Sequence, residues 1–148
     1  MANPIKWRPA WVFPQHVEDF IASQCRGFTV HVMNGRSKLG DLRIDMFTDE
    51  TDVRGDAFAL PLKDRCADTV VCDPPWGLDY RIRGRLLYEL RRIIRPGGRL
   101  VFNAPWSPKL PGLPIESIYV PDRQLMSFHQ LALVFVSRKI KGELPWDS

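Results

Sequence analysis

Short apolar runs separated by polar turns recur along the chain, and each run has the length of a single strand. The runs are rich in β-branched and aromatic residues, a composition that favours buried strands. We expect strands at residues 28–33, 42–47, 53–57, 69–72, 99–103, 117–120 and 131–137. The last two are predicted to pair antiparallel, because residues 121–130 provide only a tight link between them.

Two segments instead carry apolar residues at helical spacing. Residues 14–25 begin with Pro14, which suits the first turn of a helix, and end before Gly27, which suits its carboxyl end. Residues 84–94 place their apolar side chains on one face and stop at Pro96-Gly97-Gly98. The apolar side chains of that face are Leu86, Leu87, Leu90 and Ile94.

The order of these elements predicts the fold class. Buried strands joined by crossovers imply an α/β domain with a mainly parallel sheet and an antiparallel final strand. The link at residues 34–41 is too short for a crossover helix, which needs about a dozen residues or more, so we expect a reduced helix content. Residues 1–148 are expected to form one domain, with an extended arm at residues 1–14 and a polar tail at residues 139–148.

The composition limits the classes of function. Hydrophobic residues make up 45% of the chain and charged residues 26%, as in ordinary globular proteins. No apolar run reaches the ~20 residues of a membrane span, and residues 1–11 lack the apolar core of a secretory signal. Three cysteines and three histidines are scattered without metal-ligand spacing, so we expect no metal site. These features together indicate a cytoplasmic protein without membrane association.

The charge permits a polyanionic partner without proving one. The net charge is +4 and the isoelectric point is about 9.2. Many of the basic side chains are concentrated between residues 81 and 95, namely Arg81, Arg83, Arg85, Arg91, Arg92 and Arg95. Two interpretations of this arginine cluster remain open, a solvated helix face and a patch that contacts phosphates.

One stretch carries more chemistry than any other, because the apolar run at residues 69–72 ends at Asp73-Pro74-Pro75-Trp76. Prolines cannot donate to a β-ladder, so the strand must end there. A carboxylate, rigid backbone carbonyls and a flat indole are then left at the carboxyl end of a strand. Open α/β sheets bind ligands at that edge. The alternative is a proline-rich turn in which the tryptophan only packs.

Three segments taken in order resemble class I S-adenosylmethionine-dependent methyltransferases. They are Gly55-Asp56-Ala57 followed by Leu60-Pro61, then residues 67–76, then residues 87–100. In order and spacing they are similar to that family's third motif, its fourth motif and its junction between a helix and the fifth strand. The resemblance covers residues 28–102 and continues more weakly to residue 139. It implies a Rossmann-like fold and S-adenosyl-L-methionine as the cofactor.

The resemblance also implies which acids bind the cofactor. Asp45, at the end of the second predicted strand, is expected to accept from both ribose hydroxyls, since a carboxylate has two acceptor oxygens. Asp56 is expected to accept from the adenine amino group, beside the backbone N–H of Ala57. Each acid has a simpler interpretation as a turn or capping residue.

The loop at residues 34–40 departs from the family's pattern of glycines. Gly35 matches the central glycine, whereas Met33 stands in place of the first glycine and His31 in place of an acid. We interpret His31 as a sheet histidine with satisfied hydrogen bonds. Arg36 and Lys38 are candidates to bind the methionine carboxylate. The loop residues expected at the cofactor are Asn34, Gly35 and Gly40.

Asp73-Pro74-Pro75-Trp76 resembles the signature of methyltransferases that act on exocyclic amino groups, chiefly adenine N6 and cytosine N4. Such a nitrogen is a poor nucleophile, because its lone pair is delocalised into the ring. The resemblance makes Asp73, Pro74, Pro75 and Trp76 the catalytic stretch. The Asp73 carboxylate and the Pro74 carbonyl each accept one N–H, and Trp76 stacks on the base. Adenine N6 in DNA is the predicted acceptor. Guanine N2 or adenine N6 in RNA, a protein amine and a small-molecule amine remain alternatives.

Nucleic acid is therefore the expected partner, DNA first and RNA second. Amino methyltransferases of DNA usually carry a target-recognition domain, and nothing outside the predicted core is large enough to be one. Recognition is expected to come from short segments, from a protein partner or from a second copy of the chain. The competing hypothesis is a non-catalytic, methyltransferase-like subunit that supports a partner.

Overall fold

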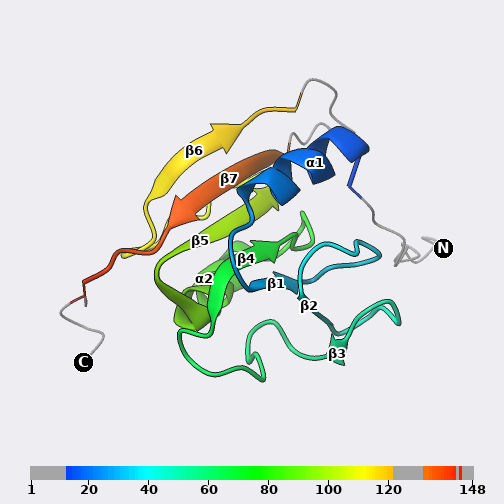
Figure 1. Cartoon of the computed structure of the whole chain (residues 1–148), viewed down its shortest axis with the longest axis horizontal. Coiled ribbons are helices and arrows are strands. Elements are labelled where there is room, and N and C mark those ends of the chain that lie inside the picture. The colour runs from blue at the N-terminus through cyan, green and yellow to red at the C-terminus, as the bar shows by residue number, and fades with distance from the viewer. Residues whose placement is uncertain (1–12, 122–131, 143, 145–148) are drawn as a thin grey trace.

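The computed structural model describes residues 13–121, 132–142 and 144. Their core is a sheet of seven strands in the order β3-β2-β1-β4-β5-β7-β6 (Figure 1). The helices are α1 (Gln15–Gln24) and α2 (Tyr80–Ile93). The strands are β1 (Thr29–Val32), β2 (Leu42–Asp45), β3 (Val53–Arg54), β4 (Ala67–Cys72), β5 (Ile94–Ala104), β6 (Ile115–Tyr119) and β7 (Leu133–Arg138).

The pairing of the strands confirms the predicted fold class. β3, β2, β1, β4 and β5 run parallel to their neighbours. β7 runs antiparallel to β5 and to β6, so the two closing strands form the expected antiparallel pair. Residues 33–41, between β1 and β2, contain no helix. The predicted tight link before β7 lies almost wholly in residues 122–131, outside the described part of the chain.

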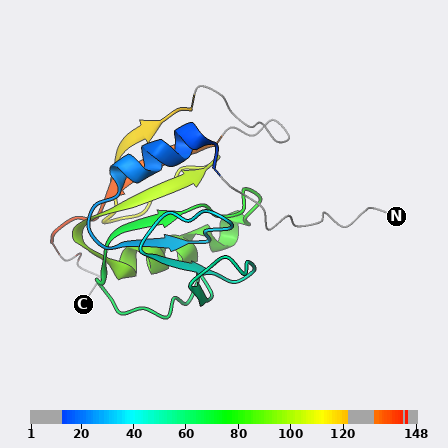
Figure 2. The same cartoon turned by 45° about the vertical axis from the view of Figure 1, so that its right-hand side comes forward.

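The two helices cover opposite faces of the sheet, as Figures 1 and 2 show. On one face, Val17 and Ile21 of α1 pack on Val71, Val101 and Val134. The larger cluster lies on the other face, where α2 packs on alternate residues of the same strands and on β1 and β2. Its central side chains include Val30, Val70, Leu86, Leu90 and Phe102. Successive side chains along a strand point to opposite faces of the sheet, so the same strands contribute to both clusters.

Helix α2 begins four residues before the predicted start at residue 84. Asp79 caps it, because its carboxylate accepts from the backbone N–H of Arg81 at 2.9 Å. Gly84 consequently lies inside the helix, where the sequence alone favours a boundary. Neither of the two helices in the described residues is long and apolar enough to cross a membrane.

Strand β5 extends across the sequence that was predicted to stop the preceding helix. It begins at Ile94 and passes through Pro96-Gly97-Gly98, where its register with β4 shifts. Gly97 has a φ of +80°, and a Cβ on Gly98 would lie 2.7 Å from the backbone oxygen of Asp68. Proline and glycine in a strand are typical of such an irregularity. The predicted third strand, in contrast, ends early at Arg54 and leaves Asp56 and Ala57 in a loop.

Candidate active site

A cavity of about 580 Å³ lies at the carboxyl edge of the parallel strands. Four segments that are distant in sequence line it, each following or ending one strand: β1, β2, β3 and β4. Eight predicted site residues are among its lining: Gly35, Asp45, Asp56, Ala57, Asp73, Pro74, Pro75 and Trp76. The resemblance therefore placed most of its site residues around one cavity.

Asp73 directly follows β4 and lies beside β5. Since Cys72 pairs with Phe102 in the parallel register, the next residue of β5 is Asn103. The Asn103 side-chain amide donates from Nδ2 to Asp73 Oδ1 at 3.1 Å. Asn103 is only 5% exposed, so the donor of this hydrogen bond is shielded from water. Nothing in the sequence pattern singled out Asn103, because it ends a predicted apolar strand 30 residues after Asp73.

Asp45 ends β2 and holds the loop that follows β1. Its Oδ2 accepts from the backbone N–H of Gly35 at 3.0 Å, and its Oδ1 accepts from the backbone N–H of Phe47 at 2.8 Å. The residue is 9% exposed and lines the cavity. A carboxylate has about four acceptor positions, so about two remain for the hydroxyls of a ligand.

Asp56 and Ala57 form a turn after β3. Asp56 Oδ1 accepts from the backbone N–H of Phe58 at 2.9 Å, which is an Asx turn. Ala57 is buried in the wall of the cavity. The turn therefore brings Asp56 and Ala57 to the same cavity.

Helix α2 anchors the chain just beyond this turn. Glu89 Oε1 accepts from the backbone N–H of Leu60 at 2.7 Å. Arg92 binds the same carboxylate at 2.6 and 2.9 Å and also binds the Leu62 carbonyl at 2.8 Å. The Arg92 guanidinium holds the pKa of Glu89 below its ordinary value. Glu89 and Arg92 thus act as a clamp that fixes the loop leading away from the cavity.

Met33 adopts the backbone conformation that a glycine would favour. Its φ is +58°, in the left-handed region, and Gly35 has a φ of +56°. The backbone N–H of Met33 donates to the Ile44 carbonyl at 2.8 Å, which fixes the turn next to β2. The Met33 side chain lines the cavity. The turn therefore has a conformation that glycine favours, and it carries the Met33 thioether into the cavity wall.

Two predicted cofactor residues lie outside the cavity lining. The Asn34 amide donates to the Ser37 carbonyl of its own loop at 3.1 Å and to the Glu50 carbonyl, between β2 and β3, at 2.9 Å. Gly40 packs behind β1, where a Cβ would lie 3.2 Å from His31 Cβ. Both residues shape the loop, because they pin its backbone or allow its close approach to the strand.

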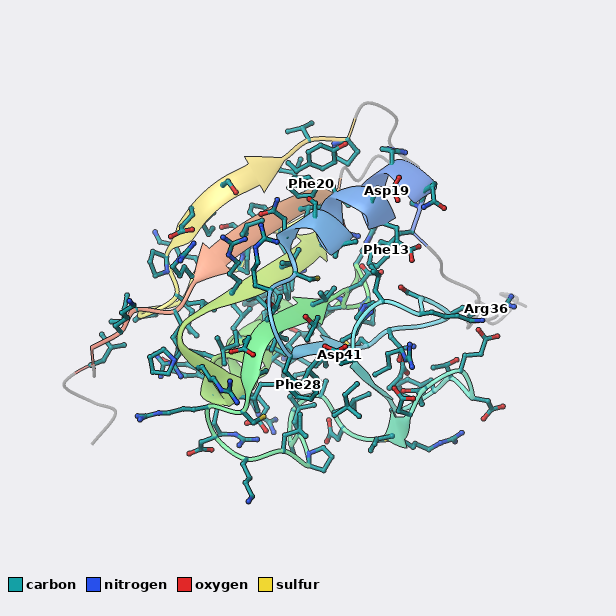
Figure 3. All side chains as sticks on the ribbon, in the orientation of Figure 1. Phe13, Asp19, Phe20, Phe28, Arg36 and Asp41 are labelled. Carbon is teal, nitrogen blue, oxygen red and sulfur yellow. The ribbon has the colours of Figure 1, made fainter. Side chains whose placement is uncertain are left out.

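The basic side chains of the loop also lie away from the cavity. Arg36 pairs with Glu50 at 3.0 Å, and its side chain projects outward from the molecule in Figure 3. Arg36 and Lys38 border a separate, polar depression together with Arg43. The sequence-based assignment of Arg36 and Lys38 to a methionine carboxylate is therefore not supported by this geometry.

His31 is buried in β1 and does not face the cavity. Its Nδ1 lies 3.2 Å from the Leu39 carbonyl, so this nitrogen carries the proton. Its ring stacks on Phe13, with centroids 6.0 Å apart. Burial lowers the pKa of His31 to about 4. The interpretation as a sheet histidine is confirmed for Nδ1, whereas Nε2 is buried without a partner in the described residues.

The sequence-based reasoning also missed the apolar part of the lining. Most of the missed residues follow β2 or β3, and Phe47 is 71% exposed at the cavity wall. Their only signal in the sequence was their position next to predicted site residues. They are Ile44, Met46, Phe47, Gly55 and Phe58.

The charged side chains of the lining are all acidic. Asp45, Asp56 and Asp73 line the cavity, and the described residues contribute no basic side chain to it. The cavity therefore favours a neutral or cationic ligand with several hydrogen-bond donors. Within the described residues, no group of three or more His, Cys, Asp or Glu side chains is arranged to hold a metal ion.

Every arginine of the cluster between residues 81 and 95 has a partner within the fold. Three form ion pairs: Arg81–Asp79, Arg92–Glu89 and Arg95–Asp68. Arg83 and Arg91 donate to backbone carbonyls, and Arg85 lies 5.7 Å from the centre of the Phe58 ring. Arg81, Arg85 and Arg95 are nevertheless exposed, whereas Arg91 and Arg92 hold α2 against distant segments through the Pro111 and Leu62 carbonyls.

No family model matches the chain, and no curated protein is similar to it in sequence. Solved structures nevertheless resemble it. A SAM-dependent methyltransferase from Methanosarcina mazei matches with a TM-score of 0.60 at 12% identity, over 82% of this chain and 97% of that one. A complex between the Haloferax volcanii Trm112 methyltransferase activator and a methyltransferase gives 0.60 at 14% identity, over 87% and 90%. The [4+2]-cyclase SpnF gives 0.64 at 13% identity, over 86% and 81%.

The chain has the Rossmann-like fold of SAM-dependent methyltransferases. The cyclase among its structural neighbours shows that this fold also carries other activities. The reaction must therefore be argued from the residues of the cavity.

Proposed function

We propose that this protein is an S-adenosylmethionine-dependent N-methyltransferase whose acceptor is the exocyclic amino group of a nucleobase. Adenine N6 in DNA is the first candidate. One observation carries the proposal: the Asp73-Pro74-Pro75-Trp76 stretch lines the same cavity as Asp45 and Asp56. The groups that hold an amine and the groups that suit an adenosine therefore open into one space.

The cavity suits S-adenosylmethionine in size and in donor chemistry. Its volume of about 580 Å³ is within the range of roughly 300–1,000 Å³ common for small-molecule sites. Asp45 has acceptor positions for the ribose hydroxyls, and Asp56 with the backbone of Ala57 suits the adenine. Gly35 allows the chain to approach closely. When bound, the cofactor supplies an electrophilic methyl group with a positively charged sulfur, which the acidic lining favours.

The residues after β4 make the amino group reactive. The Asp73 carboxylate and the Pro74 carbonyl each accept one N–H, which favours a pyramidal nitrogen with its lone pair free. The ring of Pro74 restricts its own backbone and the residue before it, so both acceptors are preorganised. Trp76 provides a flat surface for the ring, a contact worth about 1–3 kcal/mol in nucleic-acid sites. Asp73 is also a base that can accept the proton released after transfer.

A transfer assay with labelled cofactor tests this proposal. The acceptors should include unmethylated DNA, RNA, free nucleosides and nuclease-treated cell extract, so that each alternative acceptor class is tested. Mass spectrometry of the digested products then identifies the methylated base. Asp73→Ala serves as the inactive control. No transfer to DNA, RNA or nucleosides, under conditions in which the cofactor binds, would contradict the proposal.

A second candidate is a non-catalytic subunit that supports a partner protein. The presence of Met33 favours this second candidate. Its side chain occupies space in the cavity where the methyltransferase pattern has a glycine. The Haloferax volcanii neighbour, a methyltransferase bound to an activator, offers a precedent for a protein partner or a second copy that completes target recognition. Calorimetry with S-adenosylmethionine separates the two candidates. A folded protein without measurable cofactor binding favours the subunit.

A further inference from the structure

Asn103 is a buried polar side chain in an apolar environment. Its neighbours along β5, Phe102 and Ala104, are both fully buried, and its partner on β7 is Val134. Burying an amide without a compensating hydrogen bond costs about 1–3 kcal/mol in proteins. The hydrogen bond from Asn103 Nδ2 to Asp73 Oδ1, at 3.1 Å, offsets that cost. An apolar residue at this position would serve the core at least as well, so packing alone does not explain the asparagine.

The hydrogen bond has a definite effect on the Asp73 carboxylate. An N–H that donates to a carboxylate favours its charged form and restricts the rotation of the group. One oxygen is held against β5, and the orientation of the other is thereby set. Asp73 lines the cavity, whereas Asn103 does not. Any effect of Asn103 on a ligand in the cavity must therefore pass through Asp73.

We propose that Asn103 is a positioning residue, which keeps the Asp73 carboxylate ionised and oriented toward the amino group of the acceptor. The role in catalysis rests on the proposed function, while the effect on the carboxylate does not. The two groups that accept from the amine are then held in different ways. The proline ring restricts the backbone that carries the Pro74 carbonyl, and the hydrogen bond from Asn103 on β5 holds the Asp73 carboxylate. Asn103 also explains how a carboxylate at a partly buried strand end stays available as an acceptor.

Nuclear magnetic resonance tests the effect on Asp73 without any assay of activity. The Cγ resonance of Asp73 is followed against pH in the wild type, in Asn103→Leu and in Asn103→Asp. We expect the titration midpoint to rise by about one pH unit in Asn103→Leu, because the charged form loses a donor. It should rise further in Asn103→Asp, because a second carboxylate repels the first. The Cys72 thiol does not interfere, since burial raises its pKa well above this range.

Matched controls separate positioning from a general loss of structure. Ser137→Ala removes a buried hydroxyl from β7, which has no hydrogen-bond partner in the described residues, and should leave the Asp73 titration unchanged. The neutral variant Asn103→Ser offers a shorter donor and should give a midpoint between those of the wild type and Asn103→Leu. An unchanged midpoint in a folded Asn103→Leu protein would overturn the inference.

Kinetics with an identified acceptor test the catalytic part. Asn103→Leu is expected to lower kcat about tenfold while the cofactor Kd stays at the wild-type value. Asn103→Asp should move the acid limb of the rate profile to higher pH. If the wild type transfers methyl groups and Asn103→Leu matches its kcat, the positioning role is wrong although the proposed function stands. If the wild type transfers to no acceptor, the proposed function fails, and the resonance titration still decides whether Asn103 controls the carboxylate.

Discussion

The two walls of the cavity differ in how closely they follow the methyltransferase pattern. The wall after β4 carries the Asp73-Pro74-Pro75-Trp76 stretch as the pattern has it, and Asn103 supports it from β5. The wall after β1 keeps the turn but replaces a glycine with Met33 at a φ of +58°. We call the wall after β4 the acceptor wall and the walls after β1, β2 and β3 the cofactor wall, after their proposed roles. The acceptor wall is thus recognisable from its residue types, whereas the turn after β1 keeps its backbone conformation although Met33 stands in place of a glycine.

The largest effect is expected at the acceptor wall. Asp73→Ala should lower methyl transfer by about a thousandfold, because the amine loses the acceptor that exposes its lone pair. The cofactor Kd should change by less than about twofold, since the ribose and adenine acceptors lie on other strands. Single-turnover assays and calorimetry measure the two quantities. Equal losses in transfer and in cofactor binding would show that the two walls are not separate.

Behind the cofactor wall, His31 makes the stability depend on pH. Burial lowers its pKa to about 4 from 6.5, so between these values the unfolded chain binds a proton that the folded chain excludes. The free energy of unfolding should therefore be fully present above pH 6.5 and fall by about 3 kcal/mol as the pH drops to about 4. Urea unfolding of wild type and His31→Leu measures this contribution. An identical pH dependence in His31→Leu would contradict the neutral, buried assignment.

Asp45 tests the cofactor wall itself. Asp45→Ala should weaken cofactor binding by about 10- to 100-fold, because charged hydrogen bonds contribute about 1.5–3 kcal/mol each. Part of the loss comes from the loop, since Asp45 also accepts from Gly35. Asp45→Asn keeps one acceptor oxygen and should lose less affinity. If calorimetry finds wild-type affinity in Asp45→Ala, the assignment of the ribose site is wrong.

Met33 is expected to give the smallest effect, in the opposite direction. A non-glycine residue in the left-handed region carries a strain of about 1–2 kcal/mol. Met33→Gly should relieve that strain, enlarge the cavity and tighten cofactor binding several-fold. Met33→Ala also enlarges the cavity but keeps a Cβ in the left-handed conformation. Comparing the two variants therefore separates the effect of the added space on binding from the effect of the relieved strain. Weaker binding in Met33→Gly would indicate that the thioether contacts the cofactor directly.

Much of the fold was predictable, because strand patterning depends on local sequence. The strands and both helices lie close to their expected places, and the order of motifs indicated the parallel sheet. The boundaries that were missed depend on distant partners. Gly84 continues a helix because Asp79 caps it, and Pro96-Gly97-Gly98 enters β5 because β4 supplies a partner.

The gathering of Asp45, Asp56 and Asp73 at one cavity was predictable, because each motif places its acid at or just after the end of a strand. It was not predictable where a role depends on a neighbouring strand. Asn103 reaches Asp73 only through the pairing of β4 with β5. The sequence suggested that Gly40 contacts the cofactor, whereas in the structure it packs against His31. The sequence alone does not indicate which neighbouring segment a loop glycine approaches.

A structure with S-adenosylhomocysteine, the demethylated product of the cofactor, tests the central claim most directly. We predict that the ligand occupies the cavity at the carboxyl edge, with its ribose on Asp45, its adenine beside Asp56 and Ala57, and its sulfur toward Asp73. The same structure would show whether Gly35 or Met33 approaches the amino-acid portion. A ligand bound elsewhere, or placed with its sulfur away from Asp73, would contradict the assignment of the two walls.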